Sequence, residues 1–358
     1  MLSRNYAFTV CACAFLLLGA HASAQIQVQS PGSTSSVPVH LQASVSSCNG
    51  NSITGLSYSV DSSPFYTMNP SGQINAYDYS ILPGAHTIRF KAWTGGSSPC
   101  EETDVNTTVS DNISPTTAIN LDDKPNNDPV TESTSTPDLW FGVPDTGTGC
   151  CIYENGTATT TYTTTSGPNI DGQSRLYYVE SNAQGSDTPG ERYSIVFGQN
   201  GENFTHFVYD TYLYLADPGN IFSIEMDTNQ ADSSGNIYLF GLQCVALSPS
   251  PQWQYTLNDN GDTWVSSGAS CNPQSWKANT WHHVQLYVYR SGENVTYDSV
   301  SIDGITTFIN KGGNSYFVES PAWSAGVLLL NLQLDAINNG GKTTTITAYA
   351  DGFSMFYW

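Results

Sequence analysis

Apolar and polar residues alternate without a break in the segment Phe222–Asn229. Ile224 and Met226 fall on one face of an extended strand, whereas Glu225 and Asp227 fall on the other. Three further segments of the C-terminal half show the same alternation: residues 206–215, 281–289 and 327–335. Each of these strands therefore has an apolar face that needs a core and a polar face that does not. Such strands constrain the chain to a layered β fold.

The polar faces of these strands carry carboxylates, amides and aromatic rings. Asp and Asn are poor strand formers, so a strand with Glu225, Asp227 and Asn229 on one face usually keeps them because a polar partner docks there. Planar hydrogen-bonding groups and rings together suit sugar recognition. The alternative is a sheet face that is polar only for solubility. The candidate ligand-binding residues are Glu225, Asp227, Asn229, Asp210, Tyr212, His283, Gln285, Tyr287, Asn331 and Gln333.

The N-terminus has the features of a secretory signal peptide over residues 1–24. Arg4 supplies a positive charge, Ala7–Ala20 an apolar core, and Ala22 to Ala24 a small-residue cleavage site. We therefore expect a secreted, extracellular protein whose mature chain begins near Gln25. No later segment is long and apolar enough for membrane insertion.

Charge narrows the choice of partners. Without Arg4 the chain has 9 basic and 31 acidic residues, a net charge near −22 (9 − 31). Nucleic acids and anionic membranes require basic patches, so both are disfavoured. Polyanionic substrates such as pectin or alginate are disfavoured for the same reason. A neutral polysaccharide or a cell-surface glycan is the expected partner.

Six cysteines follow the signal peptide, and an even number in an exported chain favours disulfides over metal ligation or catalysis. Their positions within two expected domains suggest the pairs Cys48–Cys100 and Cys244–Cys271. The adjacent residues Cys150 and Cys151 either bridge each other or pair elsewhere.

The chain length predicts two domains. Residues 25–110 contain short strands separated by turns, and the segments Tyr58–Asp61 and Leu82–Trp93 resemble bacterial immunoglobulin-like repeats of secreted proteins. This resemblance implies an immunoglobulin-like β-sandwich that acts as a spacer without chemistry of its own.

Residues 111–138 are rich in Pro, Asp, Asn, Ser and Thr and have no apolar period, which predicts a linker. The acidic run Asp122 to Asp128 offers calcium ligands, but Pro125 interrupts it and no calcium-loop motif fits. We expect no cofactor and no metal, with calcium as the alternative.

Residues 139–358 contain ten or more strands and no convincing helix, which is too many strands for one open sheet and predicts a jelly roll of two stacked antiparallel sheets. This domain resembles the concanavalin A-like lectin/glucanase superfamily, including its laminin-G-like members. The matching segments are Phe222–Gln230, Trp281–Leu286, Ser301–Gly304 and Tyr349–Met355. The resemblance implies the fold more strongly than the function, because the superfamily contains lectins, hydrolases, lyases and adhesive modules.

Within that superfamily, the strand also resembles the E-x-D-x-x-E motif of family-16 glycoside hydrolases. Glu225 and Asp227 match the nucleophile and the helper acid, but Gln230 stands where the general acid would be. Glutamine has no proton to give to a leaving group. Either Asp335 or Asp210 substitutes, or the site binds without cleaving.

We therefore expect an all-β protein with an N-terminal immunoglobulin-like β-sandwich and a C-terminal concanavalin A-like jelly roll, acting as a monomer that binds a neutral polysaccharide. Glu225, Asp227, Gln285, Asn331 and Gln333 should share the concave face of one sheet. The first alternative is a glycoside hydrolase using Glu225 with Asp227 or Asp335. A polysaccharide lyase is disfavoured because Arg, Lys and His are scarce, and a structural or adhesive surface protein is the remaining alternative.

Overall fold

The structure is a computed structural model that describes residues 25–48, 50–126, 138–143, 158–182, 188–198, 201–258, 263–318 and 323–358. Apart from three 3₁₀ turns, the regular elements of these residues are all β-strands, which confirms the all-β expectation. The turns are η1 (Gly201–Asn203), η2 (Pro218–Asn220) and η3 (Pro273–Ser275). Within this part of the chain no helix is long and apolar enough to span a membrane. The signal peptide, Cys150 and Cys151 lie outside the described residues.

The first domain is a sandwich of two small sheets. One sheet has the order β1-β3-β8 and the other β2-β10-β9-β6-β7. Leu41, Ile88 and Phe90 are fully buried between them. The strands are β1 (Gln27–Ser30), β2 (Thr34–Ser35), β3 (Val39–Ser44), β6 (Gly55–Val60), β7 (Thr67–Asn69), β8 (Gln73–Asp78), β9 (Gly84–Trp93) and β10 (Glu101–Val109), with a separate pair β4 (Ser47–Cys48) and β5 (Asn51–Ser52). The immunoglobulin-like assignment stays a prediction.

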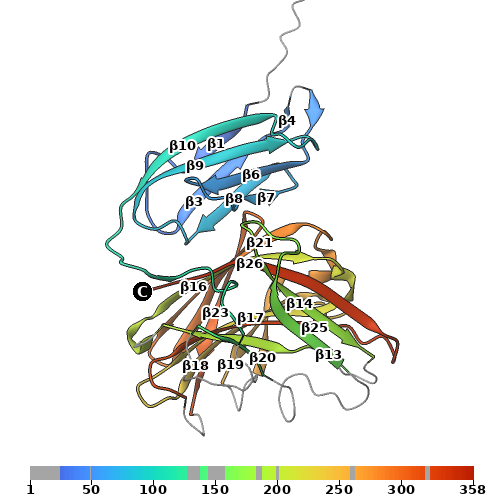
Figure 1. The fold of residues 1–358 in the computed structure, drawn as a ribbon. Helices are drawn as coiled ribbons and strands as arrows, with labels where there is room; N and C mark the ends of the chain where they lie inside the picture. Colours follow the sequence, from blue (N-terminus) through green and yellow to red (C-terminus); the bar gives the residue numbers. More distant parts are fainter. Residues whose placement is uncertain are drawn as a thin grey trace, which may run out of the picture.

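The second domain stacks two antiparallel sheets beneath the first domain (Figure 1). The sheet that touches the first domain, here the domain-facing sheet, consists of β13 (Ala158–Thr165), β14 (Ser174–Ser181), β26 (Thr344–Tyr357), β16 (His206–Leu215), β21 (Trp281–Ser291), β22 (Asn294–Ile302) and β23 (Ile305–Asn314). The other sheet, here the outer sheet, consists of β12 (Trp140–Val143), β15 (Arg192–Phe197), β25 (Leu328–Ala336), β17 (Ile221–Ala231), β18 (Ile237–Val245), β19 (Gln252–Leu257) and β20 (Thr263–Ser270), with β24 (Tyr316–Phe317) paired to β18. A bridge between Asn75 and Ile305 joins β8 to β23, so the domain-facing sheet continues into the first domain.

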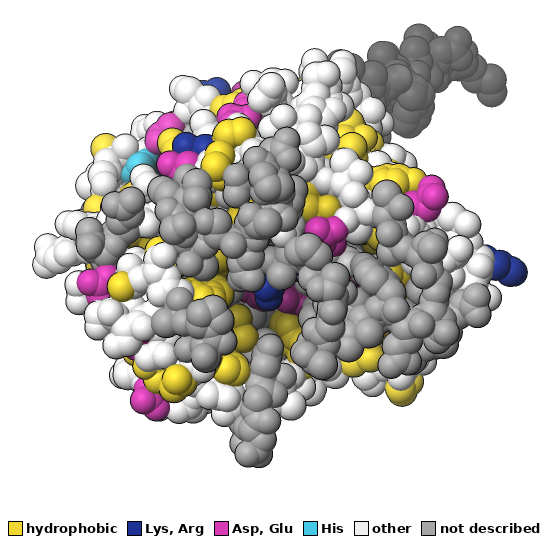
Figure 2. Space-filling model, turned by 60° about the horizontal axis from the view of Figure 1, so that its bottom comes forward, with side chains coloured by type: hydrophobic (Ala, Val, Ile, Leu, Met, Phe, Trp, Pro, Cys, Tyr) yellow, Lys and Arg dark blue, Asp and Glu magenta, His cyan; other side chains and the backbone are white. Residues whose placement is uncertain are grey.

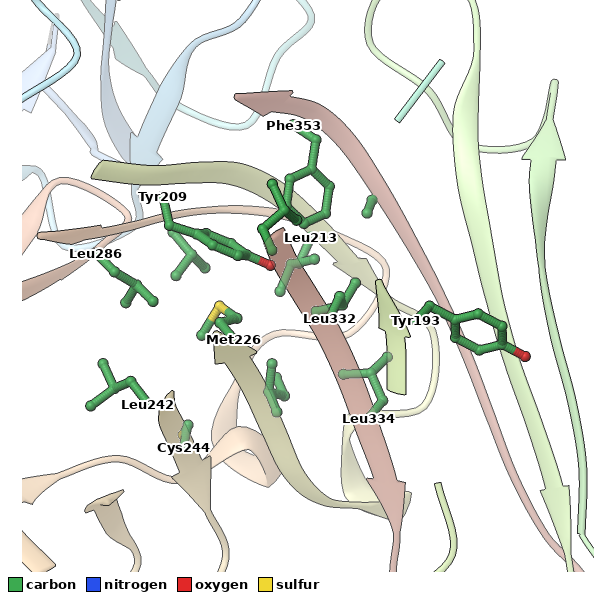
Figure 3. Packing of buried hydrophobic residues seen from close by; sticks show 14 of the residues in the cluster. Tyr193, Tyr209, Leu213, Met226, Leu242, Cys244, Leu286, Leu332, Leu334 and Phe353 are labelled. Atoms are coloured by element: carbon green, nitrogen blue, oxygen red, sulfur yellow. The ribbon is translucent and has the colours of Figure 1, made fainter. Parts of the chain in front are cut away.

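The core of the second domain fills the space between its two sheets. Tyr209, Leu286 and Phe353 project from the domain-facing sheet toward Met226 and Leu332 of the outer sheet (Figure 3). All five are nearly inaccessible to solvent. The apolar half of the sequence alternation therefore faces the core, because period two places every second side chain of a strand on the same side.

Both disulfides that the sequence predicts are present in the structure. Cys244 and Cys271 are bonded, with Cα atoms 5.4 Å apart, and join β18 to the chain after β20. Cys48 and Cys100 are bonded with a Cα separation of 6.3 Å and lie within the first domain. Each bond therefore closes a loop inside one domain.

The expected linker is shorter than the sequence suggests, because residues 116–126 belong to the second domain. Strand β11 (Thr116–Ala118) pairs with β26, and Leu121 is buried in the core of the second domain. The buried Arg175 donates from Nε to the Asp122 carbonyl at 3.0 Å, and Oδ1 of Asp122 accepts the Phe353 amide at 2.7 Å. The Asp122 carboxylate, considered above as a calcium ligand, therefore binds this segment to β26.

Candidate functional site

Strand register gathers polar side chains into a row across the outer sheet. Arg192 on β15 lies opposite Gln333 on β25, and Gln333 lies opposite Glu225 on β17. Glu225 in turn lies opposite Gln243 on β18, and Gln243 opposite Gln254 on β19. Directly paired residues share one face of a sheet, and the core takes the other face. We call these five residues the polar row.

A second, shorter row lies one pleat along the same face. Asn331 lies opposite Asp227 on one side and Ser194 on the other. Its Nδ2 donates to Oδ2 of Asp227 at 2.9 Å, and its Oδ1 accepts the Ser194 hydroxyl at 2.7 Å. These two bonds fix the orientation of the Asn331 amide, with Nδ2 toward Asp227 and Oδ1 toward Ser194. The amide of Asn331 therefore holds the Asp227 carboxylate in one orientation.

Asp335 is held in a similar way at the other side of the polar row. Gln333 donates from Nε2 to Oδ1 of Asp335 at 2.9 Å, and the Ser223 hydroxyl donates to Oδ2. The face thus carries three carboxylates, Glu225, Asp227 and Asp335, two of which are bound by neighbouring amides. Polar groups that are ordered before a ligand arrives reduce the entropy lost on binding.

These polar residues are buried although they point away from the core. Exposed fractions are 6% for Glu225, 2% for Asp227 and 1% for Gln333. In Figure 2, which views the second domain from the side away from the first, the surface is hollowed near its centre, and acidic and basic side chains lie together in the hollow. Nε of Arg192 and Oδ1 of Asn229 have no hydrogen-bond partner among the residues that the structure describes. Such buried polar atoms are the ones that a polar ligand can satisfy.

An apolar cluster borders the polar rows on the same face. Asn229 lies opposite Leu329, which lies opposite Val196. Leu329 and Val196 pack with Phe141, and the partly buried Trp323 joins them. The face therefore changes from amides and carboxylates at one end to apolar side chains at the other.

Half of the sequence-predicted site residues lie elsewhere. β16 and β21 belong to the domain-facing sheet, so their polar residues do not meet Glu225. The expectation that Gln285 shares a face with Glu225 is therefore wrong. Alternation tells which side of a strand a residue occupies but not which sheet the strand joins. The displaced residues are Asp210, Tyr212, His283, Gln285 and Tyr287.

His283 connects the two domains. Its Nε2 lies 2.9 Å from Oδ1 of Asp210 and its Nδ1 lies 2.6 Å from the hydroxyl of Thr67 in the first domain. The Tyr212 ring stacks on the imidazole at 4.4 Å. Burial alone lowers the pKa of His283, but the carboxylates around it, chiefly Asp210, outweigh this effect, and the pKa is raised above its ordinary value.

Gln285 makes a second polar connection at the same junction. Its Nε2 donates to Asp210 at 2.7 Å and to Asp78 of the first domain at 3.1 Å. Its Oε1 accepts the Tyr79 amide at 2.9 Å. Tyr79 stacks on Tyr287 with ring centres 4.0 Å apart. The polar face of the domain-facing sheet is therefore used to dock the first domain.

Gln230, which replaces the third acid of the hydrolase motif, is a structural residue. The register of β17 with β18 is unbroken from Ser223 to Ala231, so residues 225 and 230 point to opposite faces. Its Nε2 donates to the Phe204 carbonyl at 2.8 Å and its Oε1 accepts Arg290 Nε at 2.6 Å. No acid at position 230 of this strand would face Glu225.

Sequence reasoning missed three members of the polar row, namely Arg192, Gln243 and Gln254. Arg192 is the first residue of β15, Gln243 lies in β18 and Gln254 lies in β19, and none of these three strands was considered for binding. Arg192 lies two residues before Ser194 and therefore on the same face. Gln243 and Gln254 each follow a core residue, Leu242 and Trp253, and therefore point away from the core.

No family model matches this chain, and no curated protein is similar to it. Similar solved structures include a β-sandwich carbohydrate-binding module (TM-score 0.29, 10% identity, covering 92% of this chain and 96% of the other). A second is the lectin UEA-II bound to galactose (TM-score 0.31, 11% identity, 62% and 98%). A third is the alginate lyase vAL-1 from Chlorella virus (TM-score 0.33, 11% identity, 56% and 91%). Similarity at TM-scores near 0.3 and identities near 10% does not show a function for this chain.

Proposed function

We propose that this protein binds a neutral polysaccharide across the polar face of the outer sheet. The polar row carries the proposal, because it crosses five neighbouring strands from Arg192 to Gln254 without a gap. At about 4.8 Å per strand the row is about 19 Å long, which suits several units of a sugar chain. A row of this length fits an extended polymer better than a compact metabolite.

The chemistry of the face complements a sugar. Amides donate and accept hydrogen bonds, as sugar hydroxyls do, and Gln333, Gln243 and Gln254 supply them along the polar row. The apolar cluster around Leu329 and Phe141 offers a surface for the C–H face of a pyranose. Among the described residues of this face, the carboxylates outnumber the guanidinium of Arg192, and the chain has a net charge of −21, so a neutral glycan is favoured over a polyanion. The two disulfides suit an oxidising, extracellular compartment.

Hydrolysis of the bound glycan is the second candidate, and one observation favours it. Asp335 lies opposite Ser223, two residues before Glu225 on the same strand, so Glu225 and Asp335 are diagonal neighbours on one face. Diagonal neighbours stand about 7–8 Å apart, within the range of about 5–10 Å that separates the carboxylates of glycosidases. Asp210 no longer qualifies as the second acid, because it lies at the domain junction.

The experiment measures binding and reducing-sugar release on a panel of neutral polysaccharides, with wild type, E225Q and Q254A. For a binding protein, we expect Q254A to weaken affinity about fivefold through one lost hydrogen bond, and E225Q to change it by about tenfold or less. For a hydrolase, E225Q should lower turnover by several orders of magnitude and retain binding. The matched control is Q73A, an exposed glutamine on β8 of the first domain. Unchanged affinity in both E225Q and Q254A, or no binding to any glycan of the panel, would overturn the proposal.

A further inference from the structure

A cavity of about 420 Å³ opens between the two domains and is separate from the outer sheet. Tyr66 and Met68 line it from the first domain, and Asn169, Asn279 and Trp281 line it from the second. Ligand pockets in proteins have volumes of about 300–1,000 Å³. This cavity, here the junction cleft, is therefore large enough for a small organic ligand.

We propose that the junction cleft is a second sugar-binding site, which takes a short neutral segment of a glycan. Among the residues that the structure describes, its lining contains no charged side chain, although the chain as a whole carries a net charge of −21. A neutral lining in such an acidic protein complements a neutral ligand, because neither an anion nor a cation would find a partner there. The lining consists of two aromatic rings, two amides, one hydroxyl and the apolar side chains of Pro64, Met68 and Ile170.

Tyr66 is the first of the two aromatic residues in the cleft. It is 48% exposed, and Phe308 is the other large aromatic residue exposed to that degree in the described part of the chain. The Tyr66 ring stacks on Trp93 with a centroid distance of 6.3 Å and an interplanar angle of 22°. This contact fixes the ring while leaving much of it open. A fixed and exposed ring loses little side-chain entropy when a pyranose stacks on it.

Trp281 and Asn279 supply the opposite wall. The Trp281 ring packs edge-on against Tyr214 at 5.5 Å, and the Tyr214 hydroxyl donates to Oδ1 of Asn279 at 3.2 Å. This bond orients the Asn279 amide, so its Nδ2 is the donor that a sugar hydroxyl can use. The Asn279 backbone is also held, because its N–H donates to the Leu215 carbonyl at 2.8 Å.

The two proposed sites differ in position and in composition. The outer-sheet site consists of second-domain residues alone, whereas the junction cleft needs both domains. A chain with two separate sites for neutral glycan would bind a polymer with avidity or connect two polymer chains. A ligand in the cleft should also hold the domains together and raise the midpoint of thermal unfolding.

The test is calorimetric titration of the full chain with cellotetraose, laminaritetraose and mannotetraose, in wild type and in a Q254A background that weakens the outer-sheet site. We expect Y66A to weaken binding at one site by at least fivefold and to leave the other site unchanged. N279D, which keeps a residue tolerant of the backbone φ of 55° but removes the amide donor, should weaken the same site. Thermal unfolding of each variant without ligand checks the fold.

The matched control is F308A, which removes a ring that is 49% exposed and also packs on a single aromatic neighbour, Tyr77, at 5.2 Å. F308A should bind like wild type. If Y66A and N279D bind like wild type while Q254A abolishes binding, all binding belongs to the outer sheet and the cleft proposal is wrong. If none of the three tetrasaccharides binds in the Q254A background, the cleft proposal is likewise wrong. The outer-sheet proposal is tested separately, by the binding of Q254A and E225Q to the polysaccharide panel.

Discussion

His283 on β21 and Asp210 on β16 are diagonal neighbours on paired strands, with Nε2 of the imidazole 2.9 Å from Oδ1 of the carboxylate. Both residues are more than 90% buried, because the first domain covers this part of the sheet. The hydroxyl of Thr67 approaches the second ring nitrogen at 2.6 Å. The pair therefore belongs to the contact between the domains and gives that contact a dependence on pH.

The first prediction concerns this dependence. The carboxylates of Asp210, Asp78 and Asp303 overcome the effect of burial and raise the pKa of His283. A pKa raised by folding stabilises the protein fully below the unfolded value of about 6.5, and this contribution is lost as the pH rises through the folded value. Urea unfolding of wild type should therefore show falling stability above neutral pH. H283Q should show a smaller fall; an identical fall would contradict the assignment.

Asp122 provides a second prediction, in which stability again falls as the pH rises. Burial raises the pKa of the Asp122 carboxyl to about 7. The hydrogen bond from the Phe353 amide lowers this pKa, and the nearby charge of Asp351 raises it. Because the carboxyl pKa is raised by folding, the contribution of Asp122 to stability is fully present below about pH 3.9. This contribution is lost as the pH rises to about 7. D122N removes this titration and keeps an acceptor for the amide. It should gain on the order of 3 kcal/mol over wild type at pH 8 and almost nothing at pH 4, measured by urea unfolding. Equal pH profiles would show that this carboxyl does not titrate with folding.

The third prediction tests how residues 116–126 are held. Arg175 is fully buried and donates to the Asp122 carbonyl, to Oδ1 of Asn126 and to the Lys124 carbonyl. Its guanidinium also lies over the Trp140 ring, 5.2 Å from the ring centre. R175M would leave these acceptors without a donor, so we expect a loss of about 3–5 kcal/mol in the free energy of unfolding.

Limited proteolysis provides the second measurement for R175M, because cleavage between residues 111 and 126 should become faster when the segment detaches. R175K is the matched comparison, since it keeps the charge but lacks the planar fork that reaches three acceptors. A segment that stays protected in R175M would mean that β11 and Leu121 are sufficient to hold it.

The strands themselves were predictable from local sequence. Residues 221–229 were expected as a strand, and β17 runs from Ile221 to Ala231. Strand β20 shows no apolar alternation that would predict it, because Ser267 is its single buried residue. The same is true of β23, where Ile309 is the single buried side chain. An apolar alternation of period two identifies strands that cover a core, but edge strands and exposed strands do not show it.

The site was only half predictable, for a physical reason. Glu225, Asp227, Asn331 and Gln333 come together because β17 and β25 pair in the outer sheet. His283 carries the same kind of pattern, yet β21 pairs with β16 in the other sheet. Pairing between strands that are distant in sequence depends on the whole fold, and a single strand contains no record of its neighbours. The contact between the first domain and the domain-facing sheet could not be predicted from the sequence for the same reason.

The last prediction concerns the bond between Asn331 and Asp227 in the outer-sheet site. Asn331 is fully buried and donates from Nδ2 to Oδ2 of Asp227 at 2.9 Å. N331D replaces that donor by an oxygen and sets two carboxyl groups against each other. Two carboxylates so close cannot both ionise, so one must keep a proton or both must separate. We expect a loss of about 3 kcal/mol in the free energy of unfolding at pH 7.

The pH profile separates charge repulsion from a packing defect in N331D. The destabilisation should shrink as the pH falls toward 4, because protonation of one carboxyl restores a hydrogen bond between the pair. The control is S194A, which removes only the neutral bond from the Ser194 hydroxyl to Oδ1 of Asn331 and should cost about 1 kcal/mol at every pH. A deficit in N331D that is equally large at pH 4 and pH 7 would show that Asp227 is not held as an anion by Asn331. The outer-sheet face would then offer one negative charge fewer to its ligand.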